Sequence, residues 1–221
     1  MKTNDELQRK VIEAINWEPL LSAAEIGVEA FDGIVTLTGS VNSYAKKEEA
    51  EAAAKNVSGV KVVVEKIEVV LNEKNQKSDF EIAAEIINAF KWHWDIPHDR
   101  VQVKVENGWV TLTGSLEWHY QKEEAKKAVS VLIGVKGIIN NIMIISLSKD
   151  RINKKDIEDA IERNKIIGNI AITVEVLDNS VTLKGNVESW FQKNEASRLA
   201  WKARGVLEVK NNLHVEHEQQ P

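Results

Sequence analysis

The sequence predicts an α+β fold built from three tandem domains, each with the element order α-β-β-α-β. The strongest observation is an internal repeat: the strand-like segment at residues 35–41 recurs at 110–116 and at 181–187. A glycine inside each segment is followed twenty residues later by a second glycine and a valine. The pairs are Gly39 and Gly59, Gly114 and Gly134, and Gly185 and Gly205. Self-similarity at a fixed interval indicates consecutive copies of one small unit.

Each copy is predicted to begin with a helix. Its start resembles a capping box. In this motif a hydroxyl or amide side chain caps the first turn, and an acid three residues later accepts a hydrogen bond from the backbone N–H of the capping residue. The three starts are Thr3-x-x-Glu6, Ser78-x-x-Glu81 and Asn153-x-x-Asp156. Apolar residues follow at helical spacing. They are Leu7, Val11 and Ile15 in copy one, Ile82, Ile86 and Phe90 in copy two, and Ile157 and Ile161 in copy three.

A β-hairpin is predicted after the helix and its loop, because apolar residues then alternate with polar ones. The alternating residues begin at Ile26, Val101 and Ile172, and the second strand places a valine and a leucine on the core face. The two strands are joined by Asp32-Gly33, Asn107-Gly108 or Asp178-Asn179. Such pairs tolerate the positive φ of a type I′ turn.

A second, alanine-rich helix and a last strand complete each copy. The alanines suit close packing of this helix on the sheet, and the glycine after it fits a helix C-cap. Both helices can then cover one face of a three-stranded sheet. Polar stretches at Asn72–Lys77 and Ser146–Arg151 suggest domains at residues 1–74, 75–149 and 150–221.

The composition narrows the possible functions. The chain has 29 basic and 34 acidic residues, a net charge of -5 and a pI near 5.7. A nucleic-acid partner is not expected, because such proteins carry a basic excess. No cysteine is present, so disulfides and thiolate metal sites are excluded. No apolar run is long enough to span a bilayer, and the polar N-terminus predicts a cytoplasmic protein, or a periplasmic one if a leader was removed.

The repeated residues resemble the BON domain of bacterial envelope and osmotic-stress proteins. The resemblance covers nearly the whole chain and rests on the Val-x-Leu-x-Gly strand, the charged and alanine-rich helix, and the segments 134–144 and 205–215. Copy one departs from the pattern, since Glu65-Lys66 replaces the paired asparagines of those segments. The resemblance implies non-catalytic binding of phospholipid surfaces or hydrophobic ligands, with no cofactor.

The loop after the first helix is the first candidate binding site. Apolar residues gather there in all three copies: Trp17, Leu20 and Leu21; Trp92, Trp94 and Ile96; and Ile166 and Ile167. Exposed indole and leucine side chains suit insertion at a membrane interface. Copy two is the expected docking copy, because its loop is the richest in tryptophan and its residues carry no net charge. In the alternative interpretation these loops pack onto the core or against the next domain.

A second aromatic cluster is predicted at the start of the second helix. It contains Tyr44, Trp118, Tyr120, Trp190 and Phe191, followed by lysines such as Lys47, Lys122 and Lys193. Aromatic residues beside lysines could contact anionic headgroups. The interleaved glutamates instead favour a solvated helix face. In another interpretation the aromatic residues form seams between copies.

The arrangement of the five histidines supports neither a metal site nor an enzyme active site. Neither His93 with His98 nor His214 with His217 has a matching acid in all copies, and two ligands leave a zinc site incomplete. We therefore predict a binding protein for a phospholipid surface or hydrophobic ligand, with a multivalent protein–protein adaptor as the alternative and a histidine-based hydrolase as a remote one.

Overall fold

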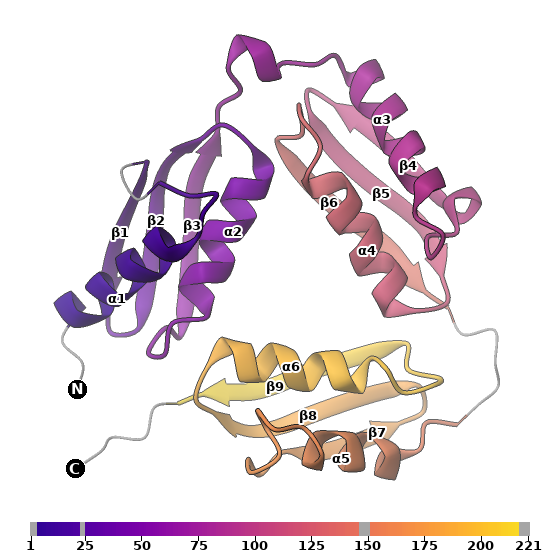
Figure 1. Ribbon diagram of the computed structural model, residues 1–221. Helices are drawn as coiled ribbons and strands as arrows, with labels where there is room; N and C mark the ends of the chain where they lie inside the picture. The colour runs from indigo at the N-terminus through magenta and orange to yellow at the C-terminus, as the bar shows by residue number, and fades with distance from the viewer. Residues whose placement is uncertain (1–3, 23–24, 146–150, 217–221) are drawn as a thin grey trace. The chain divides into compact units, whose positions relative to one another are not determined.

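The computed structural model describes residues 4–22, 25–145 and 151–216 (Figure 1). Each repeat has the predicted order α-β-β-α-β. Repeat one contains α1 (Asn4–Trp17), β1 (Ile26–Phe31), β2 (Ile34–Val41), α2 (Tyr44–Lys55) and β3 (Val62–Val69). Repeat two contains α3 (Asp79–Trp92), β4 (Val101–Glu106), β5 (Trp109–Leu116), α4 (His119–Ser130) and β6 (Gly137–Ile144). Repeat three contains α5 (Lys154–Glu162), β7 (Thr173–Leu177), β8 (Ser180–Val187), α6 (Trp190–Ala200) and β9 (Glu208–Val215).

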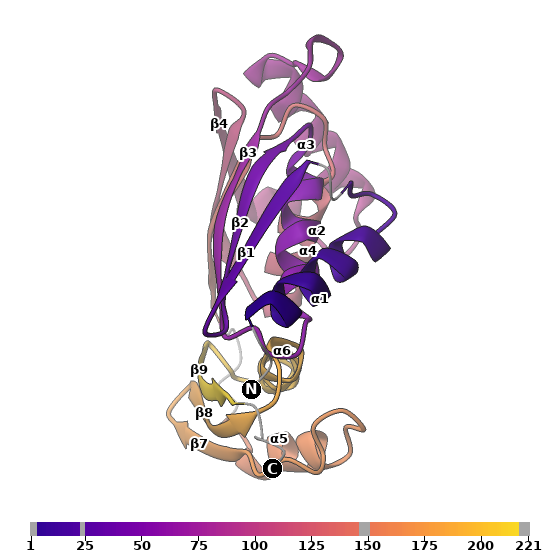
Figure 2. The same ribbon diagram turned by 90° about the vertical axis from the view of Figure 1, so that its left-hand side faces the viewer.

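Each repeat has its own three-stranded sheet, in sequence order. In repeats two and three the hairpin strands pair antiparallel, and the third strand pairs parallel with the second. A parallel pair needs a crossover connection, and α4 and α6 supply it. Both helices of a repeat lie on one face of its sheet, which confirms the predicted architecture; Figure 2 shows this for repeat one edge-on.

The core of each repeat lies between that sheet and its two helices. In repeat two it combines the inward stripe of α3 with alternate residues of the strands and the small side chains of α4. Its fully buried members include Ile86, Phe90, Leu112, Ala125 and Ile142. The Ser78–Glu81 capping box forms as predicted, with both reciprocal hydrogen bonds. Thr3 lies outside the described residues.

Two glycines of repeat two, one in the hairpin turn and one inside β5, have positive φ. Asn107 and Gly108 have φ of 53° and 82°, as a type I′ turn requires. Gly114 has φ of 127°, and a methyl group there would come within 2.1 Å of the Arg100 carbonyl oxygen. The third turn differs, since Asp178 has positive φ whereas Asn179 does not. Asn179 instead donates a side-chain hydrogen bond of 2.6 Å to the Gly205 carbonyl oxygen.

Element boundaries depart from expectation in two places. The first helices of repeats one and two include Trp17 and Trp92 as their last residues, so these tryptophans are helical and not part of the following loop. The polar stretch 72–77 contains a short 3-10 turn at Glu73–Asn75. Of the second predicted linker, residues 146–150 lie outside the described residues.

Candidate ligand-binding surface

The end of α3 brings two tryptophans to the surface. Trp92 is 87% exposed and Trp94 is 93% exposed. The helix ends with a hydrogen bond from the His93 amide to the Ala89 carbonyl oxygen, and a tight turn follows in which the Ile96 amide donates to the His93 carbonyl oxygen at 3.1 Å. This turn directs Ile96 inward, where only 2% of it is exposed. Ile96 is therefore a core residue, and its expected place in the binding surface was wrong.

Repeat one presents a smaller version of the same surface. Trp17 is 85% exposed and Leu20 is 59% exposed, whereas Leu21 is half-buried. The turn is held by the amide of Glu18 donating to the Ile15 carbonyl oxygen and by that of Leu21 donating to the Glu18 carbonyl oxygen. Two apolar side chains, three positions apart in sequence, thus remain in water.

Repeat three retains little of this surface. Ile166 is partly exposed, but Ile167 is completely buried, which corrects its expected role as a ligand contact. Asn164 organises the loop: its Oδ1 accepts from the amides of Ile166 and Ile167, and its Nδ2 donates to Glu195 on α6 at 2.8 Å. The shorter connection therefore turns one of its two isoleucines into the core.

The outer face of α3 adds apolar surface that the sequence analysis missed. Phe80 is 83% exposed and Ile87 is 49% exposed. These residues and Ala84 are spaced at three and four positions, so they share one face of the helix, away from the buried stripe. Repeat one has Asp5 and Arg9 where Phe80 and Ala84 stand. The signal was present in the sequence as a helix that is apolar on two faces.

The uncovered face of the repeat-two sheet is also apolar. Trp109, Ile139 and Met143 lie on this face and are each between 45% and 65% exposed. Trp109 lies over Gly137 of the neighbouring strand, where a methyl group would come within 2.4 Å of the indole. The equivalent positions in repeat three are polar: Ser180, Lys210 and His214. Exposed apolar surface is therefore concentrated in repeat two.

Comparison with known proteins identifies the repeated unit. The model of the family described as "BON domain" matches residues 3–70, 78–145 and 149–217. The chain belongs to the BON domain family. Among curated proteins, the Osmotically-inducible protein Y of Escherichia coli (strain K12) is 29% identical over 126 residues, which cover 55% of this chain and 63% of that protein. The chain thus matches less than two thirds of that relative's length.

Two solved structures of CdsD, a structural protein of the type III secretion system of Chlamydia trachomatis, are also similar to the chain. They are 14% and 13% identical to it and cover 96% and 97% of it, over 98% and 94% of their own chains. Both have a TM-score of 0.25, which is too low for a structural or functional inference.

The helix-two aromatic cluster of these BON domains is only partly accessible. Tyr120 and Phe191 are exposed, by 51% and 47%, whereas Tyr44, Trp118 and Trp190 are less exposed and partly buried. Whether they form seams between repeats stays a prediction. Within repeat three, the Lys193 ammonium lies 5.0 Å from the centre of the Trp190 ring.

The lysines beside this cluster are structural. Lys47, Lys122 and Lys193 each donate a hydrogen bond of 2.7–2.8 Å to a carbonyl oxygen of the third strand. They are therefore engaged within their own repeat and are poor candidates for headgroup contacts. Burial also lowers the pKa of the His119 imidazole, against the opposing effect of Glu123, so burial favours its neutral form.

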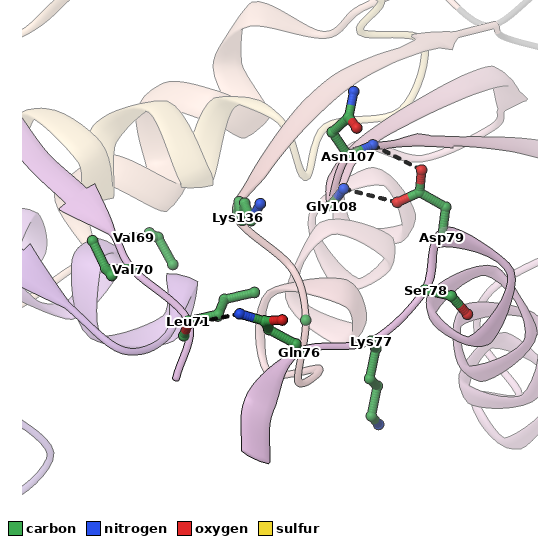
Figure 3. A pocket seen from close by; sticks show the side chains of 11 residues that line it. Val69, Val70, Leu71, Gln76, Lys77, Ser78, Asp79, Asn107, Gly108 and Lys136 are labelled. Carbon is green, nitrogen blue, oxygen red and sulfur yellow. Dashed lines mark hydrogen bonds between the residues drawn. The ribbon is translucent and has the colours of Figure 1, made fainter. Parts of the chain in front are cut away.

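An open polar hollow lies beside the start of α3 (Figure 3). Its lining comprises Val69, Val70, Leu71, Gln76, Lys77, Ser78, Asp79, Asn107, Gly108, Gly134 and Lys136. The Asp79 carboxylate accepts hydrogen bonds from the backbone amides of Asn107 and Gly108. The Ser78 side chain takes part in the capping box. The acid and the hydroxyl of this lining thus both hold the backbone in place.

The histidines do not assemble a metal site among the described residues. Within that part of the chain no three His, Cys, Asp or Glu side chains come close enough to hold an ion. His93 Nδ1 lies 3.9 Å from the Asp95 carboxylate, and His217 falls outside the described residues. No described helix is long and apolar enough to cross a membrane.

Proposed function

We propose that this BON protein is a non-catalytic binding protein that attaches to phospholipid surfaces mainly through repeat two. The observation that carries the proposal is the exposure of Trp92 and Trp94, two indoles separated by one residue, each with less than 15% of its surface covered. An indole has an apolar ring and one polar N–H, so it is most stable between lipid tails and headgroups. Two such rings at one helix end form an interfacial anchor.

The outer face of α3 supports the same surface. Phe80 and Ile87 add exposed apolar area on the helix that ends at Trp92. An amphipathic helix with this composition can lie in the plane of a membrane with its apolar face among the acyl chains. Lys91 lies in the last turn of α3, where its side chain can reach an anionic headgroup. The balanced charge of repeat two leaves little repulsion from such a surface.

The sequence similarity to the Osmotically-inducible protein Y supports a role under osmotic stress. That name describes when the relative is made. Induction of the transcript after a salt shift would test this part of the proposal.

Vesicle sedimentation tests the binding surface. Purified full-length protein would be centrifuged with vesicles of phosphatidylcholine alone, and of phosphatidylcholine with phosphatidylglycerol, at low and high salt. We expect binding to both, stronger on the anionic vesicles at low salt, and a blue shift of tryptophan emission. The double variant Trp92→Ser/Trp94→Ser should lose at least five-fold in affinity while its melting temperature stays within about 2 °C of the original.

A matched control tests whether vesicle binding depends on the loop tryptophans or on any exposed apolar side chain. Phe31 on β1 is 67% exposed and lies outside the proposed surface, so Phe31→Ser should bind vesicles like the original chain. Equal binding by the double variant, or an equal loss in both variants, would contradict the proposal. Absence of vesicle binding would favour the adaptor alternative, for which the apolar sheet face around Trp109 and Met143 offers a protein-docking area.

A further inference from the structure

Two side chains close the outer edge of the third strand in repeat two. The Lys122 ammonium on α4 donates to the Ile142 carbonyl oxygen at 2.7 Å. The Asn140 Oδ1 accepts the Ile142 amide at 3.3 Å, and the Asn140 Nδ2 donates to the Lys122 carbonyl oxygen at 3.0 Å. We call these two side chains the Lys–Asn clamp. Both backbone polar groups of Ile142 are therefore satisfied by side chains.

The clamp recurs in repeat three with nearly the same geometry. Lys193 donates to the Leu213 carbonyl oxygen at 2.7 Å, while Asn211 accepts the Leu213 amide and donates to the Lys193 carbonyl oxygen. Repeat one keeps the lysine bond through Lys47, but Glu65 stands in place of the asparagine. A carboxylate cannot donate the hydrogen bond to the helix carbonyl, so the complete clamp belongs to repeats two and three.

The backbone groups that the clamp satisfies point away from the sheet. β6 is an edge strand, since the order of the sheet is β4-β5-β6. The Ile145 amide donates to the Leu116 carbonyl oxygen and so faces β5. Backbone groups alternate sides along a strand, so Ile142, three residues earlier, faces outward. At this position an unclamped strand would offer an N–H and a C=O to another chain.

β6 lacks the usual chemical protection of an edge. Its sequence, Gly-Ile-Ile-Asn-Asn-Ile-Met-Ile, contains neither a charged residue nor a proline. Such a segment has the composition of strands that pair with copies of themselves. The other edge strands described all carry charge, among them Glu208 and Lys210 on β9 and Lys104 and Glu106 on β4. Charged side chains on an edge disfavour strand addition.

We propose that the Lys–Asn clamp is a guard that prevents β6 from pairing with β6 of a second copy of this chain. The second copy is the partner because the strand is self-complementary. Antiparallel pairing centred on Asn141 would place Ile139 of each strand opposite Met143 of the other, and both side chains are exposed in the single chain. A two-fold interface repeats each contact, so this register buries two apolar pairs.

The first test removes one arm of the clamp. Asn140→Ala should strengthen self-association at least ten-fold relative to the original chain, measured by sedimentation equilibrium over a range of concentrations. The matched control is Asn141→Ala, because Asn141 is the neighbouring, exposed asparagine and takes no part in the clamp. Backbone amides of β6 should become more protected from hydrogen exchange in the associated Asn140→Ala variant. Association that is unchanged in Asn140→Ala would overturn the proposal.

Two further variants test the edge charge and the clamp separately, and the second does not carry Asn140→Ala. Met143→Lys added to Asn140→Ala restores a charge to the edge without restoring the clamp, so it should return the variant to the association of the original chain. In repeat three, Glu208→Thr with Lys210→Thr removes the charges of β9 but leaves its clamp intact. This variant should not associate, and association through β9 would show that the clamp is not a sufficient guard.

Discussion

Asp79, the first residue of α3, accepts hydrogen bonds from the backbone amides of Asn107 and Gly108 at 2.8 and 2.9 Å. One carboxylate thus joins the start of the first helix to the hairpin turn. In repeat one the side chain of Asn4 makes one such bond, to the Asp32 amide at 3.0 Å. Repeat three has Lys154 at this position and cannot make it, because an ammonium group accepts no hydrogen bond.

Replacing this carboxylate should destabilise repeat two. We expect Asp79→Ala to cost about 1–3 kcal/mol, because two turn amides lose a charged acceptor. Urea unfolding followed by circular dichroism would measure the change. Asp99→Ala, at an exposed site in the same repeat, is the control and should stay within about 0.5 kcal/mol. An equal response of the two variants would mean that the turn is held without Asp79.

Gly114 should tolerate no side chain. Its φ of 127° is unfavourable for any L-residue with a Cβ, and the added methyl group would overlap the Arg100 carbonyl oxygen. We expect Gly114→Ala to destabilise repeat two by about 2–4 kcal/mol. Ser115→Ala, on the adjacent residue, is the control. Thermal unfolding of both variants measures the difference, and a melting temperature of Gly114→Ala equal to that of the control would refute the structural reason.

The neighbouring residues Trp94 and Ile96 should respond in opposite ways to truncation. Ile96→Ala leaves a cavity in the core and should cost about 2–4 kcal/mol of stability. Trp94→Ser removes an exposed ring and should change stability by less than about 0.5 kcal/mol. Chemical denaturation of each single variant provides the measurement. A large stability loss in Trp94→Ser would show that the indole packs onto protein.

Glu195 should make the stability of repeat three depend on pH. Hydrogen bonds from Arg198, followed by one from Asn164, hold the pKa of this carboxyl below its ordinary value of 4.5. The ionised form is therefore favoured by folding, and its contribution is complete above pH 4.5 and is lost as the pH falls through the lowered pKa. We expect Glu195→Gln to lower the melting temperature at pH 7.

The difference between Glu195→Gln and the original chain should shrink as the pH falls through the lowered pKa of Glu195, because protonation makes this side chain neutral like glutamine. Glu188→Gln, on an exposed residue before α6, is the control and should follow the original chain above and below that pKa. A difference that stays constant as the pH falls through that pKa would assign the effect to shape and packing instead of charge.

Most of the fold could be predicted because its signals are local. Capping at Ser78, alternation from Val101 and the Asn107-Gly108 turn each depend on a few adjacent residues, and all three are confirmed. The parallel pairing of β6 was not predicted, since partner and direction depend on contacts far apart in sequence. The connection from β5 to β6 is a helical crossover through α4. A crossover of this kind gives a parallel pair once β6 lies next to β5.

The binding surface was less predictable, because exposure depends on tertiary packing. Trp94 and Ile96 are both apolar loop residues, yet the backbone turn between His93 and Ile96 leaves Trp94 exposed and Ile96 buried. Lys122 and Lys193 looked like free surface cations, yet each reaches a strand carbonyl that no local pattern indicates. Phe80 could have been found, because the sequence of α3 is apolar on more than one face.

The shared strand register has a consequence for how the chain reaches its native state. Val110 pairs with Ile138 and Val181 pairs with Val209 at the same sequence separation, so β5–β6 and β8–β9 share one parallel register, which an exchange of β9 for β6 beside β5 would preserve. Exchange of this kind is a known hazard of tandem repeats. During synthesis, repeat two can close its sheet before β9 has left the ribosome. A denatured chain offers both strands at once, so refolding by dilution should show a slow phase of strand exchange that synthesis from the N-terminus avoids.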